Sequence, residues 1–124
     1  MNESIVAGVD FVSLPTTDYE RAARFYGKTL GLPCIETYDR VPGGEFQAGN
    51  LTVQVFDFAA IGRPGGPSQY PVALKVEDIE ATRATLEERG VTFLDAFDSG
   101  VCHNAIFNDP DGNVLMLHQR YAPK

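Results

Sequence analysis

An internal repeat with a spacing of 60 residues constrains this chain more than any other feature. Identical residues recur at that spacing in the two halves: Val12 and Val72, Leu14 and Leu74, Asp18 and Asp78, Glu20 and Glu80. One copy is too short to bury a sheet face by itself, so the two copies are expected to pair around a common core. A chain of 124 residues fits one compact domain built in this way.

Each copy predicts the order strand, helix and three strands. In the first copy, alternation, capping and turn residues predict strands over 9–15, 33–39, 45–49 and 51–58, a helix over 16–31 and a turn at 42–44. In the second copy, they predict strands over 72–76, 92–97, 102–107 and 114–118 and a helix over 77–90. The prediction is an α+β fold of two βαβββ modules that form a cupped mixed sheet. Module one covers about 8–57, a Gly/Pro-rich linker about 58–70, and module two about 71–120.

Helix starts are marked by acidic and hydroxyl residues in both copies. Thr17 and Glu20 are spaced as in a capping box, and Asp18 is an alternative cap for the first helix. Asp78 is the candidate cap of the second helix, and Gly90 follows its last turn.

The charge of the chain argues against nucleic acid and membranes as partners, and its cysteine content bears on where the protein is expected. The net charge is −7 and the sequence pI is about 4.6, so the chain is expected to repel nucleic-acid phosphates and anionic membranes. No apolar run has the length of a membrane span, and the first residues lack the basic and apolar regions of a signal peptide. Two cysteines, Cys34 and Cys102, cannot build a disulfide framework. We therefore expect a cytoplasmic protein.

Strand side chains alternate between two faces, and the two sets differ in character. One set, the apolar face, is expected to pack under the helices; it comprises Val12, Leu14, Leu51, Val53, Val55, Val72, Leu74, Val76, Ala105, Phe107, Leu115 and Leu117. The other set, the mixed face, comprises Phe11, Ser13, Glu45, Gln47, Thr52, Gln54, Phe56, Ala73, Lys75, Cys102, Asn104, Ile106, Met116 and His118. Polar groups among apolar ones suit the lining of a ligand pocket, although a half-solvated sheet face is the alternative.

Three stretches resemble the vicinal oxygen chelate superfamily, which includes glyoxalase I, bleomycin-resistance proteins, fosfomycin-resistance enzymes and extradiol dioxygenases. They read FVSLPTTDYERAARFYGKTLGL, VALKVEDIEATRATLEERGV and FNDPDGNVLMLH. The resemblance implies two βαβββ modules that curl their sheets into a cup, often with dimerisation. It is specific for the fold and weak for the function, because this fold serves isomerases, transferases, dioxygenases and binding proteins.

The resemblance also implies four metal-ligand positions in the cup, which fall here on Phe11, Gln54, Pro71 and Met116. Phenylalanine, proline and methionine cannot replace the His and Glu ligands of a divalent ion. The usual metal site is therefore not expected, and no cofactor is predicted.

Both histidines and one cysteine lie near the C-terminus and leave other chemistry open. Cys102 and His118 share the mixed face, whereas His103 belongs to the opposite one. With Glu45 they could form an unusual divalent metal site, or His118 could activate Cys102 as a nucleophile. The plain interpretation is a small pocket-lining cysteine and a hydrogen-bonded histidine. The acidic residues of NDPDGN are predicted to form the turn between two strands.

We predict a glyoxalase/bleomycin-resistance-like protein that binds a small organic molecule in the cup, as a homodimer and without the usual metal. Candidate catalytic residues are Glu45, His118 and Cys102; candidate ligand-binding residues are Phe11, Ser13, Thr52, Gln54, Phe56, Asn104, Ile106 and Met116. Glu45, Gln54, Cys102, Asn104 and His118 are expected to converge on one cavity, with His103 pointing away. Alternatives are a metal-dependent lyase, isomerase or dioxygenase with a relocated metal, and a structural or regulatory dimer without a ligand.

Overall fold

The computed structural model describes residues 4–63 and 65–123, and it has the predicted α+β architecture. Module one contains β1 (Phe11–Pro15), α1 (Tyr19–Arg24), a π-helical turn η1 (Phe25–Thr29), β2 (Cys34–Thr37), β3 (Gly43–Ala48) and β4 (Leu51–Phe56). Module two contains β5 (Val72–Lys75), α2 (Ile79–Glu88), β6 (Phe93–Asp98), β7 (Cys102–Asn108) and β8 (Val114–Arg120). The predicted linker holds a short 3-10 helix, η2 (Phe58–Ile61), and its position 64 lies outside the described residues.

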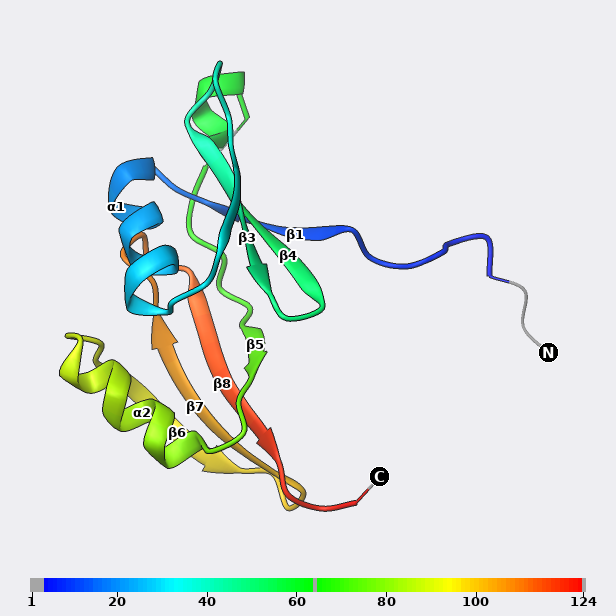
Figure 1. Ribbon diagram of the computed structural model, residues 1–124, viewed down its shortest axis with the longest axis vertical. Helices are drawn as coiled ribbons and strands as arrows, with labels where there is room; N and C mark the ends of the chain where they lie inside the picture. The colour runs from blue at the N-terminus through cyan, green and yellow to red at the C-terminus, as the bar shows by residue number, and fades with distance from the viewer. Residues whose placement is uncertain (1–3, 64, 124) are drawn as a thin grey trace.

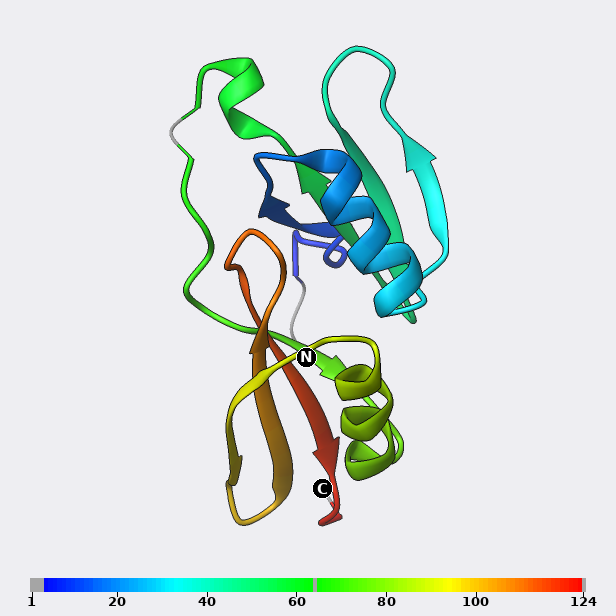
Figure 2. The ribbon, with the colours of Figure 1, turned by 90° about the vertical axis from the view of Figure 1, so that its left-hand side faces the viewer.

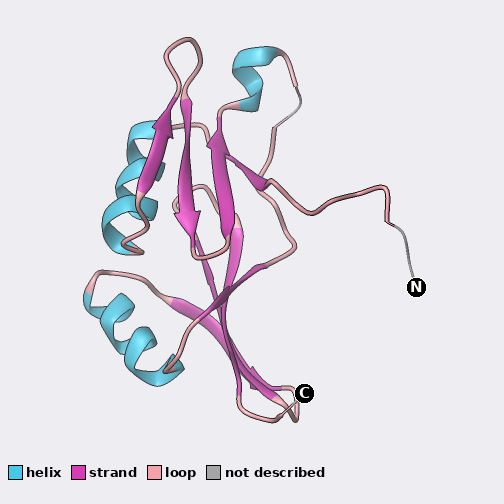
Figure 3. Ribbon diagram, turned by 45° about the vertical axis from the view of Figure 1, so that its right-hand side comes forward, coloured by secondary structure: helices cyan, strands magenta, loops and turns pink. Residues whose placement is uncertain are grey.

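Each module forms its own four-stranded sheet. The first sheet has the order β1-β4-β3-β2, and the second sheet has the equivalent order β5-β8-β7-β6. In both, the first strand runs parallel to the last strand, and the other neighbours are antiparallel. The two sheets follow one another along the long axis, and α1 and α2 lie on the same side of them (Figures 1 and 2). The faces without helices are therefore turned to a common side of the chain (Figure 3).

The predicted apolar face is confirmed as the face that builds the core. Leu14, Val53, Val55, Phe107 and Leu115 are all at most 2% exposed. They belong to one cluster with residues of α1, η1 and α2, and other members of the apolar face pack against it. Each large side chain buried there contributes about 1.5–3 kcal/mol. Because side chains alternate along a strand, the residues between these core positions must lie on the opposite, mixed face.

Equivalent aspartates begin the two helices. The Asp18 side chain accepts a hydrogen bond from Arg21 N at 3.2 Å, and that of Asp78 accepts one from Ala81 N at 3.1 Å. The predicted cap at Asp78 is confirmed, and of the two options for the first helix, Asp18 is the N-cap. The capping-box alternative from Thr17 is wrong, because the Thr17 hydroxyl instead donates to Asp111 of module two at 3.1 Å.

The turn predicted at 42–44 is wrong in part, because Gly43 and Gly44 are the first residues of β3. Glycine is needed at these two positions because side chains and backbone of neighbouring segments lie close to β3, and not because the chain turns there. A Cβ on Gly43 would lie 2.6 Å from the Phe56 ring, and one on Gly44 would lie 2.7 Å from Glu36 O and collide with Tyr19 Oη. Residues without a Cβ allow two aromatic side chains to lie against the strand.

The NDPDGN turn, between β7 and β8, forms as predicted and also fastens the two modules together. Asp109 Oδ1 accepts from the backbone N–H groups of Asp111 and Asn113, both at 2.9 Å, which shapes the turn. Asp109 Oδ2 accepts from Tyr26 Oη of η1 at 2.6 Å, and Asn113 Nδ2 donates to Pro15 O of β1 at 2.8 Å. Asp109 and Asn113 are 4% and 0% exposed, so these hydrogen bonds between the two modules are buried.

Candidate functional site

A chain of hydrogen bonds crosses the mixed face of the first sheet. Ser13 Oγ donates to Gln54 Oε1 at 2.6 Å, and Gln54 Nε2 donates to Tyr38 Oη at 3.1 Å. Tyr38 Oη in turn donates to Glu45 Oε2 at 2.5 Å. Three of these four residues were predicted site residues, and the structure brings them together through Tyr38. In this series of hydrogen bonds, Glu45 Oε1 has no hydrogen bond to the described residues.

The strand register explains why the side chains in this series of hydrogen bonds lie on one face of the sheet. Ser13 lies opposite Gln54 in the β1–β4 pair, and Gln54 lies opposite Glu45 in the β3–β4 pair. A bulge in β2 places Cys34 opposite Phe46 but Glu36 opposite Glu45. Tyr38 comes two residues after Glu36 and therefore reaches the same face.

Tyr38 is the functional candidate that sequence reasoning missed. It lies at the end of the predicted strand 33–39 and before a turn-like sequence, so the pattern did not predict its hydrogen bond to Glu45. Its even spacing from Glu36 is the one pattern that places it on the mixed face. Burial, followed by the hydrogen bond to Glu45, raises the pKa of Tyr38 above its ordinary value. The phenol therefore stays protonated at neutral pH and acts as a donor to the carboxylate.

Aromatic rings frame the polar chain. The ring centroids of Tyr38 and Phe56 are 5.9 Å apart in an edge-to-face arrangement, and those of Phe56 and Phe58 are 4.9 Å apart. Phe11, at the other end of the face, is 48% exposed. Such pairs add about 0.5–1.5 kcal/mol beyond their buried area. The result is a partly open surface on which apolar rings lie around a few hydrogen-bonded polar atoms. Thr52, the remaining predicted residue of this sheet, donates to Gln47 at 2.9 Å.

The mixed face of the second sheet is less connected. Asn104 lies opposite His118 and Ile106 lies opposite Met116 in the β7–β8 pair, as alternation predicted. Asn104 Nδ2 donates to the backbone oxygens of Phe97 and Cys102 at 3.5 and 3.4 Å. Cys102 is 6% exposed, and no hydrogen bond joins it to His118 within the described residues. A nucleophilic role for Cys102 and a base role for His118 stay predictions.

The expected convergence of five residues on one cavity also stays a prediction. Hydrogen bonds unite Glu45 with Gln54, and strand register unites Asn104 with His118, but these two groups belong to different sheets. Across residues 4–63 and 65–123, no hydrogen bond links one group to the other. His103 lies on the side of α2, opposite the mixed face, together with Gln119, which bonds Ile79 N.

The residues at the family's metal positions do not suit a divalent ion. Phe11, Pro71 and Met116 offer no side-chain nitrogen or oxygen. Gln54 has one oxygen, which already accepts the hydrogen bond from Ser13. The alternative trio of Cys102, His118 and Glu45 is not assembled either: in the described parts of the chain, no three His, Cys, Asp or Glu side chains form a group that could hold a metal.

Comparison with known proteins places the chain in a family. The sequence profile of the Glyoxalase/Bleomycin resistance protein/Dioxygenase superfamily matches residues 8–117. The chain therefore belongs to this superfamily. No curated protein matches the sequence. In the described parts of the chain, no helix has the length and apolar content needed to cross a membrane.

Solved structures of the same fold span nearly the whole chain. A glyoxalase family protein from Bacillus anthracis has a TM-score of 0.83 at 20% identity, with 97% of this chain and 100% of that chain covered. TnmS3, an antibiotic binding protein from Streptomyces sp. CB03234, has a TM-score of 0.80 at 26% identity, covering 96% and 100%. A glyoxalase/bleomycin resistance protein from the same organism has a TM-score of 0.74 at 27% identity, covering 90% and 100%.

Proposed function

We propose that this chain binds a small organic molecule on the mixed faces of its sheets, without the divalent metal of metal-dependent family members. The hydrogen-bonded chain from Ser13 through Gln54 and Tyr38 to Glu45 carries this proposal. Its polar atoms are held in fixed orientation inside an aromatic frame, which is the composition of ligand sites that combine apolar contact with a few specific polar groups.

Two further observations support binding rather than metal chemistry. The metal positions hold Phe11, Pro71 and Met116, which cannot supply ligands. Two structural relatives at 26% and 27% identity are described as an antibiotic binding protein and a glyoxalase/bleomycin resistance protein. A molecule of drug size, with apolar rings and a few hydrogen-bonding groups, matches the mixed face of the first sheet.

The proposal includes a homodimer. Both mixed faces are turned to the side of the chain away from the helices (Figures 1 and 3). Phe11 and Phe97 remain 48% and 46% exposed, and water penalises such open apolar area. A second copy related by two-fold symmetry would cover both faces and enclose the ligand. Sedimentation equilibrium at micromolar concentration is expected to give twice the chain mass of 13.5 kDa, and a purely monomeric species would contradict this part.

Ligand titration tests the binding function. The probes are bleomycin and the neutral dye Nile red, each titrated with and without EDTA. At least one is expected to bind with a dissociation constant on the order of micromolar, unchanged by EDTA. Tyr38→Phe removes the hydroxyl that orients Gln54 and Glu45 and should weaken binding about tenfold. Tyr70→Phe, at a tyrosine that is 84% exposed in the linker, is the matched control. Equal effects of the two variants, or binding only after Zn²⁺ or Mn²⁺ is added, would overturn the proposal.

The rival function is a metal-dependent lyase, isomerase or dioxygenase with a relocated metal. A bound ion stabilises the folded state by mass action, so this rival predicts that a strong chelator lowers the melting temperature. The present proposal predicts no change. Protein purified without chelator and heated with and without excess EDTA separates the two functions, with metal analysis by mass spectrometry as the second measurement.

A further inference from the structure

The N-terminal arm, residues 4–10, is exposed along its whole length. It precedes β1 and leaves the body on the side away from the helices (Figures 1 and 2). Ile5, Val6 and Val9 are 103%, 66% and 69% exposed, and a Cβ on Gly8 would meet no atom within 4 Å. The hydrogen bonds that the arm makes to described residues all lie within the arm itself. The arm therefore leaves large apolar side chains in water, which is unfavourable.

The arm has the sequence pattern of a strand but no neighbouring strand in its own sheet. Counted back from Phe11 on the mixed face, alternate positions hold only apolar residues: Val9, Ala7 and Ile5. β1 begins at Phe11, opposite Thr52, and β4 has only one residue before Thr52. The exposed β3–β4 turn precedes that residue, so no strand of the sheet continues beside the arm. The arm thus has one apolar side and no partner in its own sheet.

The mixed faces of the two sheets differ along one row of equivalent positions. In the first sheet, this row is polar and already hydrogen-bonded; it consists of Ser13, Gln54 and Glu45. In the second sheet, the repeat and the strand pairs place three apolar residues in the same row, the apolar row: Ala73, Met116 and Ile106. All three are exposed or partly exposed. The apolar row matches the apolar side of the arm, whereas the polar row would lose solvation beneath it.

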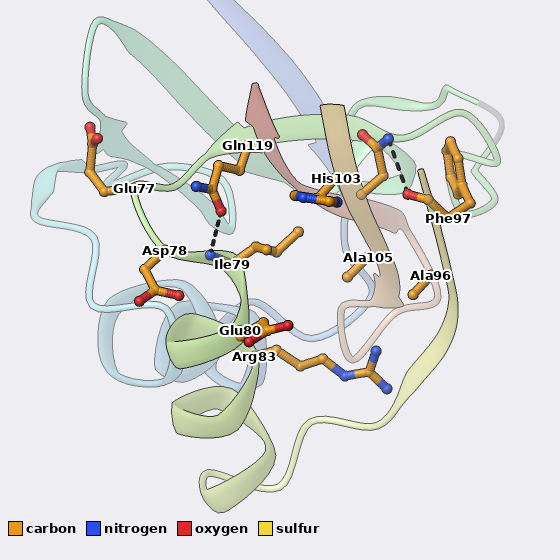
Figure 4. A pocket seen from close by; sticks show the side chains of 11 residues that line it. Glu77, Asp78, Ile79, Glu80, Arg83, Ala96, Phe97, His103, Ala105 and Gln119 are labelled. Atoms are coloured by element: carbon orange, nitrogen blue, oxygen red, sulfur yellow. Dashed lines mark hydrogen bonds between the residues drawn. The ribbon is translucent and has the colours of Figure 1, made fainter. Parts of the chain in front are cut away.

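Other surfaces suit the arm less well. The groove beside the start of α2 is lined by the charged side chains of Glu77, Glu80 and Arg83 (Figure 4), which are costly to cover with apolar groups. A lipid surface is disfavoured, because residues 1–20 contain no lysine or arginine and the net charge is −7. The arm also points away from the sheets of its own chain (Figures 1 and 3). A second copy of the chain is the partner that offers an apolar row.

A second copy that covers the mixed faces has to meet the arm. An extended segment of this length reaches about 23 Å, whereas two sheets packed face to face lie about 10 Å apart. Because the arm leaves the chain on the side of the mixed faces, it is too long to stand between two copies and has to lie along the partner (Figure 3). Two-fold symmetry repeats the contact, so both arms and both apolar rows are covered together.

We infer that the N-terminal arm of one chain packs on the apolar row of its partner. Ile5 and Val9 cover Met116 and Ile106, which a single chain leaves partly open to water. The inference rests on the homodimer of the proposed function, and it adds the segment that joins the two copies and the surface that receives it.

Sedimentation equilibrium of the full chain over a dilution series tests the role of the arm. Ile5→Asp places a charge on its apolar side and should raise the dimer dissociation constant at least about tenfold, and adding Val9→Asp should bring the rise to about 100-fold. Ile61→Asp, at an η2 isoleucine that is 53% exposed, makes the same change and should alter the constant less than about twofold. An unchanged dimer in the arm variants would overturn the inference alone, whereas a monomeric full chain would contradict the homodimer itself.

A spin label locates the arm in the dimer. Ser4→Cys, combined with Cys34→Ser to remove the exposed cysteine, carries a nitroxide at the start of the arm. This chain is mixed with a second preparation whose isoleucine and methionine methyl groups are ¹³C-labelled. The Met116 and Ile106 signals should broaden strongly, whereas that of Ile79 in α2 should not, and reduction by ascorbate should restore them. Broadening only when both labels are in the same chain would show that the arm covers its own sheet and would overturn the inference.

A double-mutant cycle tests the contact with the apolar row. Ile5→Ala and Met116→Ala should each weaken the dimer about threefold to tenfold, and together by less than the product of the two effects. Ile61→Ala combined with Met116→Ala should give the simple product. A simple product for the first pair would place the arm elsewhere on the partner and contradict the inference. Binding of the full chain to phosphatidylcholine vesicles that Ile5→Asp abolishes would assign the arm to a lipid surface and contradict it as well.

Discussion

The last hairpins of the two modules occupy equivalent places in their sheets but differ in their turns. In module one, β3 and β4 are joined by Gly49 and Asn50, both exposed, with Gly49 at a φ of 59°. In module two, the turn from Asp109 to Asn113 buries the side chains of Asp109 and Asn113, and both hydrogen-bond to module one. The repeat therefore sets the scaffold of both modules, whereas the turn residues decide which of them carries the contact between modules.

The β7–β8 turn contacts module one through hydrogen bonds of its side chains and not through apolar contact alone. Tyr26 Oη donates to Asp109, and its ring is 1% exposed. Burial, followed by the nearby charge of Asp109, raises the pKa of Tyr26 well above its ordinary value, so the phenol remains a donor. The Asp109 carboxylate accepts four hydrogen bonds, which satisfies a charge that would otherwise be costly to bury.

The largest expected effect comes from removing this carboxylate. Asp109→Ala deletes all four acceptor contacts and leaves Tyr26 Oη buried without a partner, so we expect a loss of about 3–5 kcal/mol in the free energy of unfolding. Asn50→Ala, in the exposed turn of module one, is the matched control and should change stability by less than about 0.5 kcal/mol. Urea denaturation followed by circular dichroism measures both. Similar losses in the two variants would mean that the β7–β8 turn is no more important than its counterpart.

A smaller effect is expected at Gly44 of β3, where a side chain would meet Tyr19 and Glu36. Gly44→Ala places a methyl group against Tyr19 Oη and 2.7 Å from Glu36 O, and overpacking of this kind costs about 1–3 kcal/mol. Gly27→Ala adds the same methyl group to η1, 3.6 Å from the Phe46 ring. Since this is an ordinary contact and alanine favours helix, it should be neutral or stabilise by up to about 1 kcal/mol. Equal destabilisation by both substitutions would argue against close approach as the reason for Gly44.

The strand faces and helix starts could be predicted because they depend on local chemistry. Alternation needs only the parity of each strand, and it correctly placed Leu14, Val55 and Leu117 in the core. The side chain of an aspartate caps the helix that follows it, so Asp78 could be identified without knowledge of the tertiary structure. On the candidate site, parity also placed Ser13 and Gln54 on one face, where they are hydrogen-bonded.

What could not be predicted depends on contacts between distant segments or on irregular strands. The Tyr26–Asp109 hydrogen bond joins residues 83 positions apart and requires the docked modules. Gly43 and Gly44 favour a turn locally, but the approach of Phe56 and Tyr19 makes them strand residues. The place of Tyr38 on the mixed face depends on the β2 bulge, which puts Glu36 opposite Glu45 although Cys34 lies opposite Phe46.

The smallest effect, on pH dependence, concerns the second aspartate of the same turn. Burial acts to raise the pKa of Asp111, but hydrogen bonds from Thr16 and Thr17 and the charge of Arg21 outweigh it and hold that pKa below its ordinary value of 3.8. Asp111 Oδ1 accepts from Thr17 N at 2.9 Å and from Arg21 Nη2 at 3.1 Å. These contacts again link module two to module one.

Because the folded-state pKa is the lower one, the folded chain binds fewer protons than the unfolded chain as the pH falls through this range. The stabilisation is therefore complete above about pH 5 and is lost as the pH falls through 3.8 toward the folded-state value. Asp111→Asn keeps an oxygen acceptor for Thr17 but cannot titrate, so its free energy of unfolding should fall less steeply between pH 5 and pH 3. Asp39→Asn, an exposed residue in the β2–β3 loop, makes the same change in charge and should keep the wild-type slope. Urea denaturation at five pH values measures the three slopes, and identical slopes for Asp111→Asn and Asp39→Asn would show that the cross-module carboxylate has no special role in acid stability.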